Sequence, residues 1–400
     1  MVTFLSCMNR RCLLATLPAA LAVNSFAAAT DPKIRVAVIG HTGRGNYGHG
    51  LDTMWLKIPA VEIVAVADAD AAGLAAAQKK LSVAKGFADY LAMLAEIKPD
   101  IVAIGPRHVD QHRDMLLAAI KAGAKGIYIE KPFCRSLQEV DEVIAAADKV
   151  GTKIAIAHRN RYHPVLPVIA KLVKEDAIGR VLELRARGKE DARGGSLDLW
   201  VLGSHIFNIA CFFGGAPKSC VATVLQDGKP ITKADVKKGD EGIGALAGNE
   251  VHARFEMTNG IPLFFDSVQN AGDKQAGFGL QIIGTKGIID FRIDKEPFAH
   301  LLAGSPFDPA LKEPRQWQPI TTAGIGLPEP MVDLGKQVSS HETSGLDLIA
   351  AIRDNRAPLC DAAQGREIIE MISSVFESHR LGSQRVTFPL QTRVNPLTLL

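Results

Sequence analysis

Hydrophobic and polar positions alternate in blocks over residues 34–157. Short apolar runs, rich in β-branched residues, lie at 34–39, 62–67, 101–105, 126–129 and 153–157. Runs of this length are typical of buried parallel strands, and the segments between them have the length of crossover helices. Helices are expected at 71–81, 90–97 and 110–122, and a fourth begins at the capping box Ser136-x-x-Glu139 and ends at Gly151. The pattern predicts a doubly wound parallel sheet with helices on both faces.

The pattern changes after residue 158. A helix is expected at 164–175, followed by strands at 181–187, 220–224, 251–257, 261–266, 279–283 and 287–291. Residues 251–257 alternate, so one face of that strand is expected to be covered and the other wet or interfacial. Residues 297–345 are rich in proline and glycine and are expected to be irregular, before two closing helices at 346–355 and 361–382. This half predicts an α+β domain with a mostly antiparallel sheet, open on one face.

The first strand leads into a glycine cluster, residues 40–48. Such a loop lets the backbone approach a pyrophosphate, and a helix that follows it offers unpaired first-turn N–H groups. Two registers of the dinucleotide fingerprint fit: Gly43-x-Gly45-x-x-Gly48 in full, and Gly40-x-Thr42-x-x-Gly45 with threonine in the middle. The second is preferred because its first glycine follows the strand directly. The residues expected to bind a dinucleotide are Gly40, Thr42, Gly43, Arg44, Gly45 and Asn46.

Asp68 stands directly after the second strand. A carboxylate at this point accepts hydrogen bonds from the adenosine ribose and repels a 2′-phosphate, so NAD is favoured over NADP. Arg44 softens that preference and keeps NADP open. Asp68 is also well placed to cap the next helix, and both roles are compatible.

The N-terminal segment predicts export. Arg10 and Arg11 precede an uncharged, mildly apolar run that ends in Ala27-Ala28-Ala29. This resembles a twin-arginine signal peptide over residues 1–29, with an ordinary secretory signal as the alternative, and predicts a periplasmic location. The run is too short to span a membrane.

Composition excludes several other classes of function. The net charge is only +3, and no Lys/Arg stripe alternates with aromatics, so nucleic acid is not an expected partner. The cysteines beyond the signal, Cys134, Cys211, Cys220 and Cys360, match no zinc spacing, and no metal site is expected. They are interpreted as buried thiols, with a Cys211–Cys220 disulfide as the less favoured alternative.

The motifs together resemble one family. The glycine loop, Asp68, Pro106, His112 and the tripeptide Glu130-Lys131-Pro132 are similar to those of the Gfo/Idh/MocA oxidoreductases. Further similar segments are Arg161-Tyr162-His163-Pro164, residues 178–181, Gly203-Ser204-His205, residues 278–284 and residues 352–358. The resemblance implies a Rossmann domain at 32–157, a substrate and oligomerisation domain at 158–400, and NAD or NADP as cofactor. It also implies hydride transfer at a hydroxyl-bearing carbon of a sugar, glycoside or cyclitol.

The resemblance also implies roles for single residues. Lys131 would hold the reacting hydroxyl, and His205 would be the general acid/base. Pro106, His112 and Glu130 would lie at the cofactor; Arg161, Tyr162 and His163 would shape the substrate pocket. In the family an Asp often stands four residues before this histidine and another three after it; here these are Val201 and Asn208. Asp198 is one candidate to replace the missing carboxylate, and another group acting as base is the alternative.

A second candidate for substrate contact is the charged stretch 188–195 with Asp198 and Trp200, because tryptophan stacks on sugar faces; Asn208 is expected to face the same pocket.

Export suggests that the cofactor is loaded before translocation and then retained. Three functions follow: an oxidoreductase, an NAD-dependent glycosidase that oxidises transiently, and, more distantly, a non-catalytic sugar-binding protein. The family resemblance also implies a homo-oligomer that associates through the open sheet.

Overall fold

The computed structural model describes residues 32–273, 275, 277–310 and 314–400. The predicted signal peptide, residues 1–29, lies outside the described residues. The structural statements that follow refer to the described part of the chain.

Six parallel strands form the first sheet, in the order β3-β2-β1-β4-β5-β6. They are β1 (Ile34–Ile39), β2 (Val61–Ala67), β3 (Gly86–Phe87), β4 (Ile101–Ile104), β5 (Gly126–Ile129) and β6 (Lys153–Ile156). The helices between them are α1 (Ala71–Leu81), α2 (Tyr90–Ile97), α3 (His112–Lys121) and α4 (Leu137–Val150). Strands β4 and β5 are buried at every residue, which explains their unbroken apolar runs. The predicted doubly wound sheet is confirmed.

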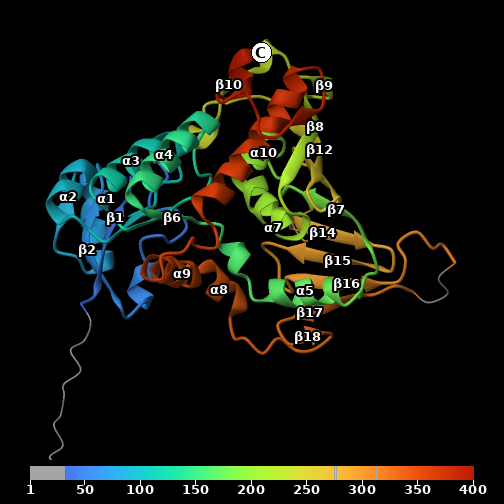
Figure 1. Ribbon diagram of the computed structural model, residues 1–400, viewed down its shortest axis with the longest axis horizontal. Helices are drawn as coiled ribbons and strands as arrows, with labels where there is room; N and C mark the ends of the chain where they lie inside the picture. Colours follow the sequence, from blue (N-terminus) through green and yellow to red (C-terminus); the bar gives the residue numbers. More distant parts are fainter. Residues whose placement is uncertain (1–31, 274, 276, 311–313) are drawn as a thin grey trace, which may run out of the picture. The chain divides into compact units, whose positions relative to one another are not determined.

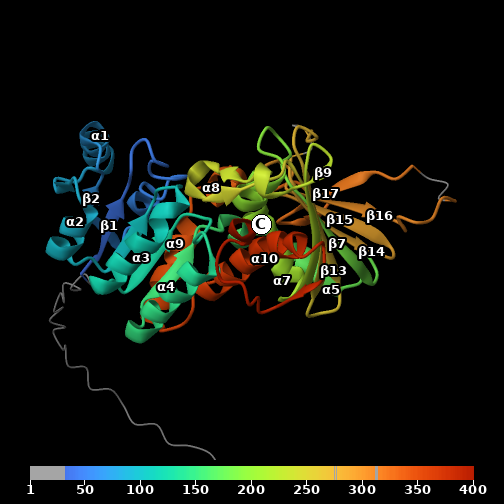
Figure 2. The ribbon, with the colours of Figure 1, turned by 90° about the horizontal axis from the view of Figure 1, so that it is seen from above.

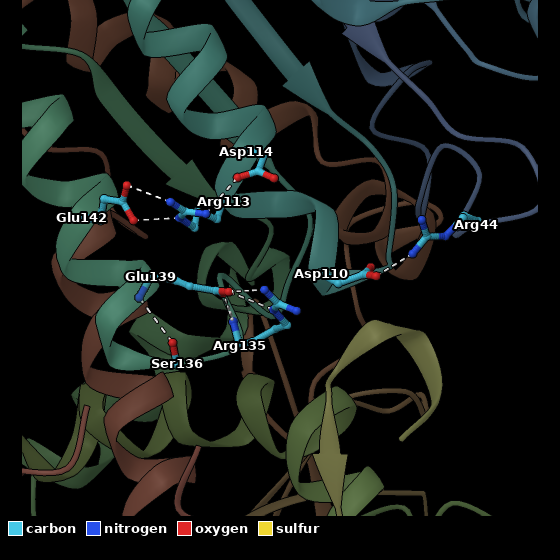
Figure 3. Close-up of polar contacts among 8 residues, drawn as sticks. All are labelled: Arg44, Asp110, Arg113, Asp114, Arg135, Ser136, Glu139 and Glu142. Carbon is cyan, nitrogen blue, oxygen red and sulfur yellow. Dashed lines mark hydrogen bonds and ion pairs between the residues drawn. The ribbon is translucent and has the colours of Figure 1, made fainter. Parts of the chain in front are cut away.

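The start of α4 follows its predicted cap, as Figure 3 shows. The Ser136 hydroxyl accepts the Glu139 N–H (3.3 Å), while the Glu139 carboxylate accepts the N–H of Arg135 (2.9 Å). Along the neighbouring face, Arg113 of α3 binds Glu142 of α4 through two nitrogens, at 2.7 and 2.9 Å. These contacts hold α3 beside α4 on one face of the sheet (Figures 1 and 2).

The glycine loop does not lead into an α-helix. Residues 41–53 form turns, and the 3-10 turn η1 (Met54–Lys57) is the one helical element before β2. The expectation of a helix N-terminus at this loop was therefore wrong. A helix from the C-terminal half, α9 (Glu342–Arg353), takes up that face of the sheet and contacts η1, β5 and β6. Leu348 joins the apolar cluster of Val36, Val38 and Tyr128.

The second sheet contains most of the later strands, in the order β18-β17-β16-β15-β14-β7-β13-β12-β8-β19. Its strands are β7 (Val181–Arg187), β8 (Pro217–Gln226), β12 (Glu250–Met257), β13 (Pro262–Val268), β14 (Gly279–Gly284), β15 (Gly287–Arg292), β16 (Ala299–Ala303), β17 (Trp317–Thr321), β18 (Gly324–Ile325) and β19 (Val386–Thr387), and β9 (Lys229–Pro230) pairs with β8. The pairing of β7 with β13 is parallel, and the other pairings are antiparallel. A separate short pair joins β10 (Lys237–Lys238) to β11 (Ala245–Leu246). The predicted α+β organisation is confirmed.

The helices of this half cover the sheet and join it to the first one. α7 (Ser204–Gly214) and α10 (Ala362–Arg380) pack against the second sheet, and α10 also contacts α4 and β6, as Figure 1 lets the reader follow. α5 (Val165–Lys174) contacts β17. Because α10 contacts both sheets and α9 packs on the first sheet, the boundary near residue 157 stays a prediction.

Two expectations for the second half need correction. Residues 297–345 are not irregular throughout, because they contain β16, β17, β18 and the helix α8 (Leu334–Ser339). Turns rich in proline and glycine separate these short elements and hid their patterns. The helix expected at 346–355 begins earlier, at Glu342.

Two further features concern the buried residues. Cys134, Cys211, Cys220 and Cys360 are free thiols, so the Cys211–Cys220 disulfide does not form. Residues 196–214 form one helical stretch apolar and long enough to cross a membrane, but 72% of its most apolar window is buried inside the protein.

Candidate active site

Two cavities lie at the carboxyl ends of the parallel strands. The first has a volume of about 380 Å³ and is lined by residues that follow β1 and β2 and by residues at the start of α3. Acidic groups dominate its lining: Asp68, Asp89, Asp110 and Asp114. The one arginine there, Arg44, is paired with Asp110 at 2.5 Å (Figure 3). The position fits the adenosine half of a dinucleotide, and the acidic lining opposes a 2′-phosphate.

Asp68 is fully engaged by the glycine loop. Its carboxylate accepts the backbone N–H and the hydroxyl of Thr42 (3.0 and 2.7 Å), the hydroxyl of Tyr47 (2.9 Å) and the N–H of Asp70 (3.0 Å). Burial alone raises the pKa of this carboxyl, but the hydrogen bonds from Thr42 and its neighbours outweigh burial and lower the pKa. A carboxylate has about four acceptor sites. A ribose hydroxyl would therefore have to displace a donor such as Tyr47, a condition the sequence did not predict.

The loop turns most of its N–H groups inward. Gly43 N–H donates to the Asn46 side chain, and the N–H groups of Arg44 and Asn46 donate to the His41 carbonyl. Together with the missing helix, this corrects the expectation of first-turn donors for phosphate. Gly43 still offers open backbone: a Cβ there would meet nothing within 4 Å, which leaves room for a pyrophosphate at this residue.

Substitution of Gly45 tests the close contact between the glycine loop and the backbone of Arg107. Its φ is +90°, and an added Cβ would lie 2.2 Å from the Arg107 nitrogen. Gly45→Ala is expected to lower the free energy of unfolding by about 2 kcal/mol or more, from left-handed strain plus the clash. Gly43→Ala, at φ +81° in open space, is the matched control and should cost about 1 kcal/mol. Urea denaturation of both variants measures the difference; equal losses would contradict the close contact at Gly45.

Glu130 and Lys131 follow β5 and line the second cavity, of about 240 Å³. The Glu130 carboxylate is buried and accepts the backbone N–H (2.9 Å) and the ring Nδ1–H (2.6 Å) of His49. Burial raises the pKa of Glu130, but the hydrogen bond from His49 and the nearby charges outweigh it and lower the pKa to about 2. Lys131 is 7% exposed, its Nζ donates to the Val201 carbonyl (2.8 Å), and burial lowers its pKa.

His205 lines the same cavity, at the start of α7. α6 (Ser196–Asp198), the π-helical turn η4 (Leu199–Gly203) and α7 are continuous, and Val201 lies in the π turn. Such turns are frequent at functional sites. His205 Nδ1 is buried and has no partner among the described residues, and its ring stands edge-on to His158 at 5.6 Å. Burial, together with the charge of Lys131, lowers the pKa of His205 well below 6.5. The imidazole is therefore neutral at pH 7, with one ring nitrogen unprotonated.

Three substrate residues predicted near His205 do not line its cavity. Asp198 accepts hydrogen bonds from the Ser267 hydroxyl (2.7 Å) and the Glu190 N–H (3.0 Å), and so does not orient His205. Trp200 is 1% exposed and packs in the core, away from a sugar face. The Asn208 amide donates to Gln364 (3.3 Å). None of these three residues lines the cavity that His205 lines.

The substrate residues predicted after β6 also lie outside the cavity that Lys131 and His205 line. The Arg161 guanidinium stacks over the Phe212 ring at 3.9 Å, and the Tyr162 hydroxyl donates to Asp347 (2.8 Å). His163 is buried against Phe298. None of the three lines the 240 Å³ cavity. The same segment instead presents Arg159 and Asn160, which the sequence analysis did not select.

His112 has a structural role. It is fully buried, with one ring nitrogen 2.7 Å from the Pro106 carbonyl and the other 2.9 Å from the Pro132 carbonyl. Its ring thus joins the loop after β4 to the loop that carries Lys131. His112 and Pro106 support the loop that carries Lys131, and neither of them lines the 380 Å³ cavity.

Several cavity residues were missed or only partly predicted. His49 and His341 line the cavity but follow no motif; only their positions in the folded chain bring them there. Lys189 and Arg193, from the charged stretch 188–195, do lie at the cavity as that stretch suggested. The described residues contain no group of three or more side chains placed to hold a metal ion.

Comparison with known proteins agrees with this geometry. The sequence model of the family described as "Oxidoreductase family, NAD-binding Rossmann fold" (GFO_IDH_MocA) matches residues 34–158. These residues form the six-stranded parallel sheet and its helices, so this part of the chain is similar to the NAD-binding domain of that family.

Among curated proteins, D-apiose dehydrogenase of Paraburkholderia graminis is 28% identical over 192 residues, 46% of this chain and 51% of that protein. The chain thus spans about half the length of this relative. Levoglucosan dehydrogenase of Pseudarthrobacter phenanthrenivorans is 23% identical over 263 residues, 60% of this chain and 66% of that protein. A solved levoglucosan dehydrogenase in complex with NADH and L-sorbose has a TM-score of 0.69 at 20% identity, covering 89% of this chain and 99% of that one. It shows the shared fold.

Proposed function

We propose that this protein is an NAD-dependent oxidoreductase that oxidises a hydroxyl-bearing carbon of a small carbohydrate or polyol. One observation carries the proposal: Lys131 and His205 meet at one cavity, at the strand edge where Rossmann sheets bind dinucleotides. The similarity to sugar dehydrogenases such as those for D-apiose and levoglucosan supports this substrate class.

Each of three residues has its own role in the proposed reaction. Lys131 Nζ, which already donates to the Val201 carbonyl, has further N–H groups to bind the oxygen of the reacting hydroxyl. Neutral His205 takes the hydroxyl proton as general base. A nicotinamide bound beside this cavity would accept the hydride from the same carbon. Glu130 holds the turn around His49 in place and keeps Lys131 at the cavity.

NAD is the cofactor that the site supports best. The cavity at β1 and β2 presents four carboxylates and one arginine that is already paired. The protein should therefore bind NADH more tightly than NADPH. Titration with each nucleotide, followed by fluorescence, measures the difference. A protein that bound neither nucleotide would refute the proposed function.

The net reaction is tested with sugars and glycosides in parallel. Oxidation of a free polyol should produce NADH, measured by nicotinamide absorbance. p-Nitrophenyl glycosides test the glycosidase alternative, since dye release without net NADH would indicate transient oxidation and elimination. Turnover that survived both Lys131→Ala and His205→Ala would show that the reaction does not use this site. Sugar binding without any detectable turnover would favour the non-catalytic binding protein.

We further propose that the protein is exported through a twin-arginine signal at residues 1–29 and retains its nucleotide. Twin-arginine export carries folded proteins, and no pool of free NAD is expected outside the cytoplasm. Protein recovered from the periplasmic fraction should release stoichiometric NAD when denatured, as read by mass spectrometry. Recovery from the cytoplasm alone would contradict export, and an empty exported protein would contradict retention.

We also propose that copies associate through the open face of the second sheet. β12 alternates buried and more exposed residues as expected, and its outward side chains include His252, bound to Asp266 at 2.6 Å. Sedimentation as a monomer would contradict this proposal.

A further inference from the structure

The 240 Å³ cavity has an excess of positive charge. Four cationic side chains and two carboxylates line it: Lys131, Arg159, Lys189 and Arg193, against Glu130 and Asp294. Lys189 is paired with Asp294 at 3.0 Å, and Arg193 with Asp191 at 2.6 Å. Glu130 pairs with His49. In the described part of the chain, Lys131 and Arg159 are the lining cations left without a carboxylate in ion-pair contact.

Arg159 begins the 3-10 turn η3 (Arg159–Tyr162), directly beyond β6. It is half-buried, and the partner found for its guanidinium is the Ser339 carbonyl, at a long 3.4 Å. Burial lowers the pKa of Arg159, which is the signature of a desolvated cation that lacks a close counter-ion. A cation held this way carries a free-energy cost unless an anion joins it.

The same field acts on the proposed base. The charges of Lys131 and Arg159 both add to the effect of burial in lowering the pKa of His205. The cavity therefore presents a positive potential to any ligand that approaches the histidine. An anionic group on the ligand would neutralise it, whereas a neutral sugar would leave both cations uncompensated.

We propose that the substrate is a monosaccharide-sized hydroxy acid whose carboxylate binds Arg159 while a hydroxyl reaches Lys131 and His205. A guanidinium presents two parallel N–H groups that match a carboxylate, so Arg159 selects for this group by shape as well as charge. The cavity volume of about 240 Å³ accommodates one sugar ring. This inference deepens the proposed function and rests on it; Arg159 is its specificity-determining residue.

The test uses matched pairs that differ in one carboxylate: glucuronate with glucose, galacturonate with galactose, and gluconate with sorbitol. Glucose 6-phosphate provides an anion of different shape. Binding is measured by calorimetry on the full protein with and without NADH, and turnover by NADH formation with NAD. Arg159→Gln removes the charge, and Arg159→Lys keeps it without the planar fork. Arg161→Gln, two residues away and stacked on Phe212 outside the cavity, is the matched control.

The acid of at least one pair should bind at least ten-fold more tightly than its neutral partner. Arg159→Gln should weaken that acid by about 10- to 100-fold, the loss of a charge-assisted pair, and leave the neutral sugar within about two-fold. Arg159→Lys should fall between, and Arg161→Gln should keep the preference. A preference for neutral sugars, a preference that survives Arg159→Gln, or tighter binding of glucose 6-phosphate than of every acid would each overturn the proposal. NADH binding separates the two levels: if NADH binds and the acids fail, the inference alone is wrong, and if NADH fails to bind, the proposed function falls as well.

Discussion

Lys131→Met should lower kcat by about 10²- to 10⁴-fold, the range found for groups that assist proton transfer. The methionine side chain has nearly the same length but cannot bind the reacting oxygen. Lys131 is 7% exposed and lies in a cavity whose nearest carboxylate, Glu130, is committed to His49. Because an apolar side chain replaces a desolvated ammonium, the free energy of unfolding should stay level or rise.

Steady-state kinetics, NADH titration and urea denaturation of this variant are measured together. Lys125→Met is the matched control: it lies just before the opposite end of the same strand, β5, and pairs with Asp100 at the surface. It should keep kcat within about two-fold. A Lys131→Met protein that folds, binds NADH and turns over at the wild-type rate would remove Lys131 from the mechanism.

Glu130→Gln should lower the free energy of unfolding by about 3 kcal/mol at pH 7. The estimate follows from the pKa of Glu130, which falls from 4.5 to about 2 on folding, at about 1.4 kcal/mol per unit. A depressed carboxyl pKa adds stability above the unfolded value, and this stability is lost as the pH falls through the folded value. The gap between wild type and variant should therefore be full above about pH 5 and close towards about pH 2.

Urea denaturation at several pH values measures this gap. Glu142→Gln is the control, because Glu142 is also in an ion pair, with Arg113, but is nearly half exposed. Screening by solvent should keep its loss below about 1 kcal/mol. A Glu130→Gln loss that stayed constant with pH would show that packing against the glycine loop, and not the carboxylate charge, is what Glu130 contributes. Gly48 supports such packing, because a Cβ there would lie 2.5 Å from Glu130 Oε1.

Much of the fold was predictable because its strands carry local signals. β4, β5 and the last four residues of β1 are buried on both faces and so form continuous apolar runs, and Ser136 and Gly151 mark both ends of α4. The short elements β16 to β18 were missed, since strands of two to five residues between proline and glycine turns have no room for a period.

The sequence by itself determined the parallel sheet and the mostly antiparallel second sheet, and the family resemblance pointed to Lys131 and His205, which line one cavity. Those features depend on hydrophobic period and on motifs that are contiguous in the chain. The tertiary structure alone decided which neighbours face the cavity. Arg159 enters it while Arg161 turns to Phe212, and His49 and His341 arrive from distant segments. It also decided that α9 replaces the helix expected after β1, and that Thr42 and Tyr47 occupy Asp68. Side-chain direction and long-range packing depend on the whole fold, and no local pattern of residues encodes them.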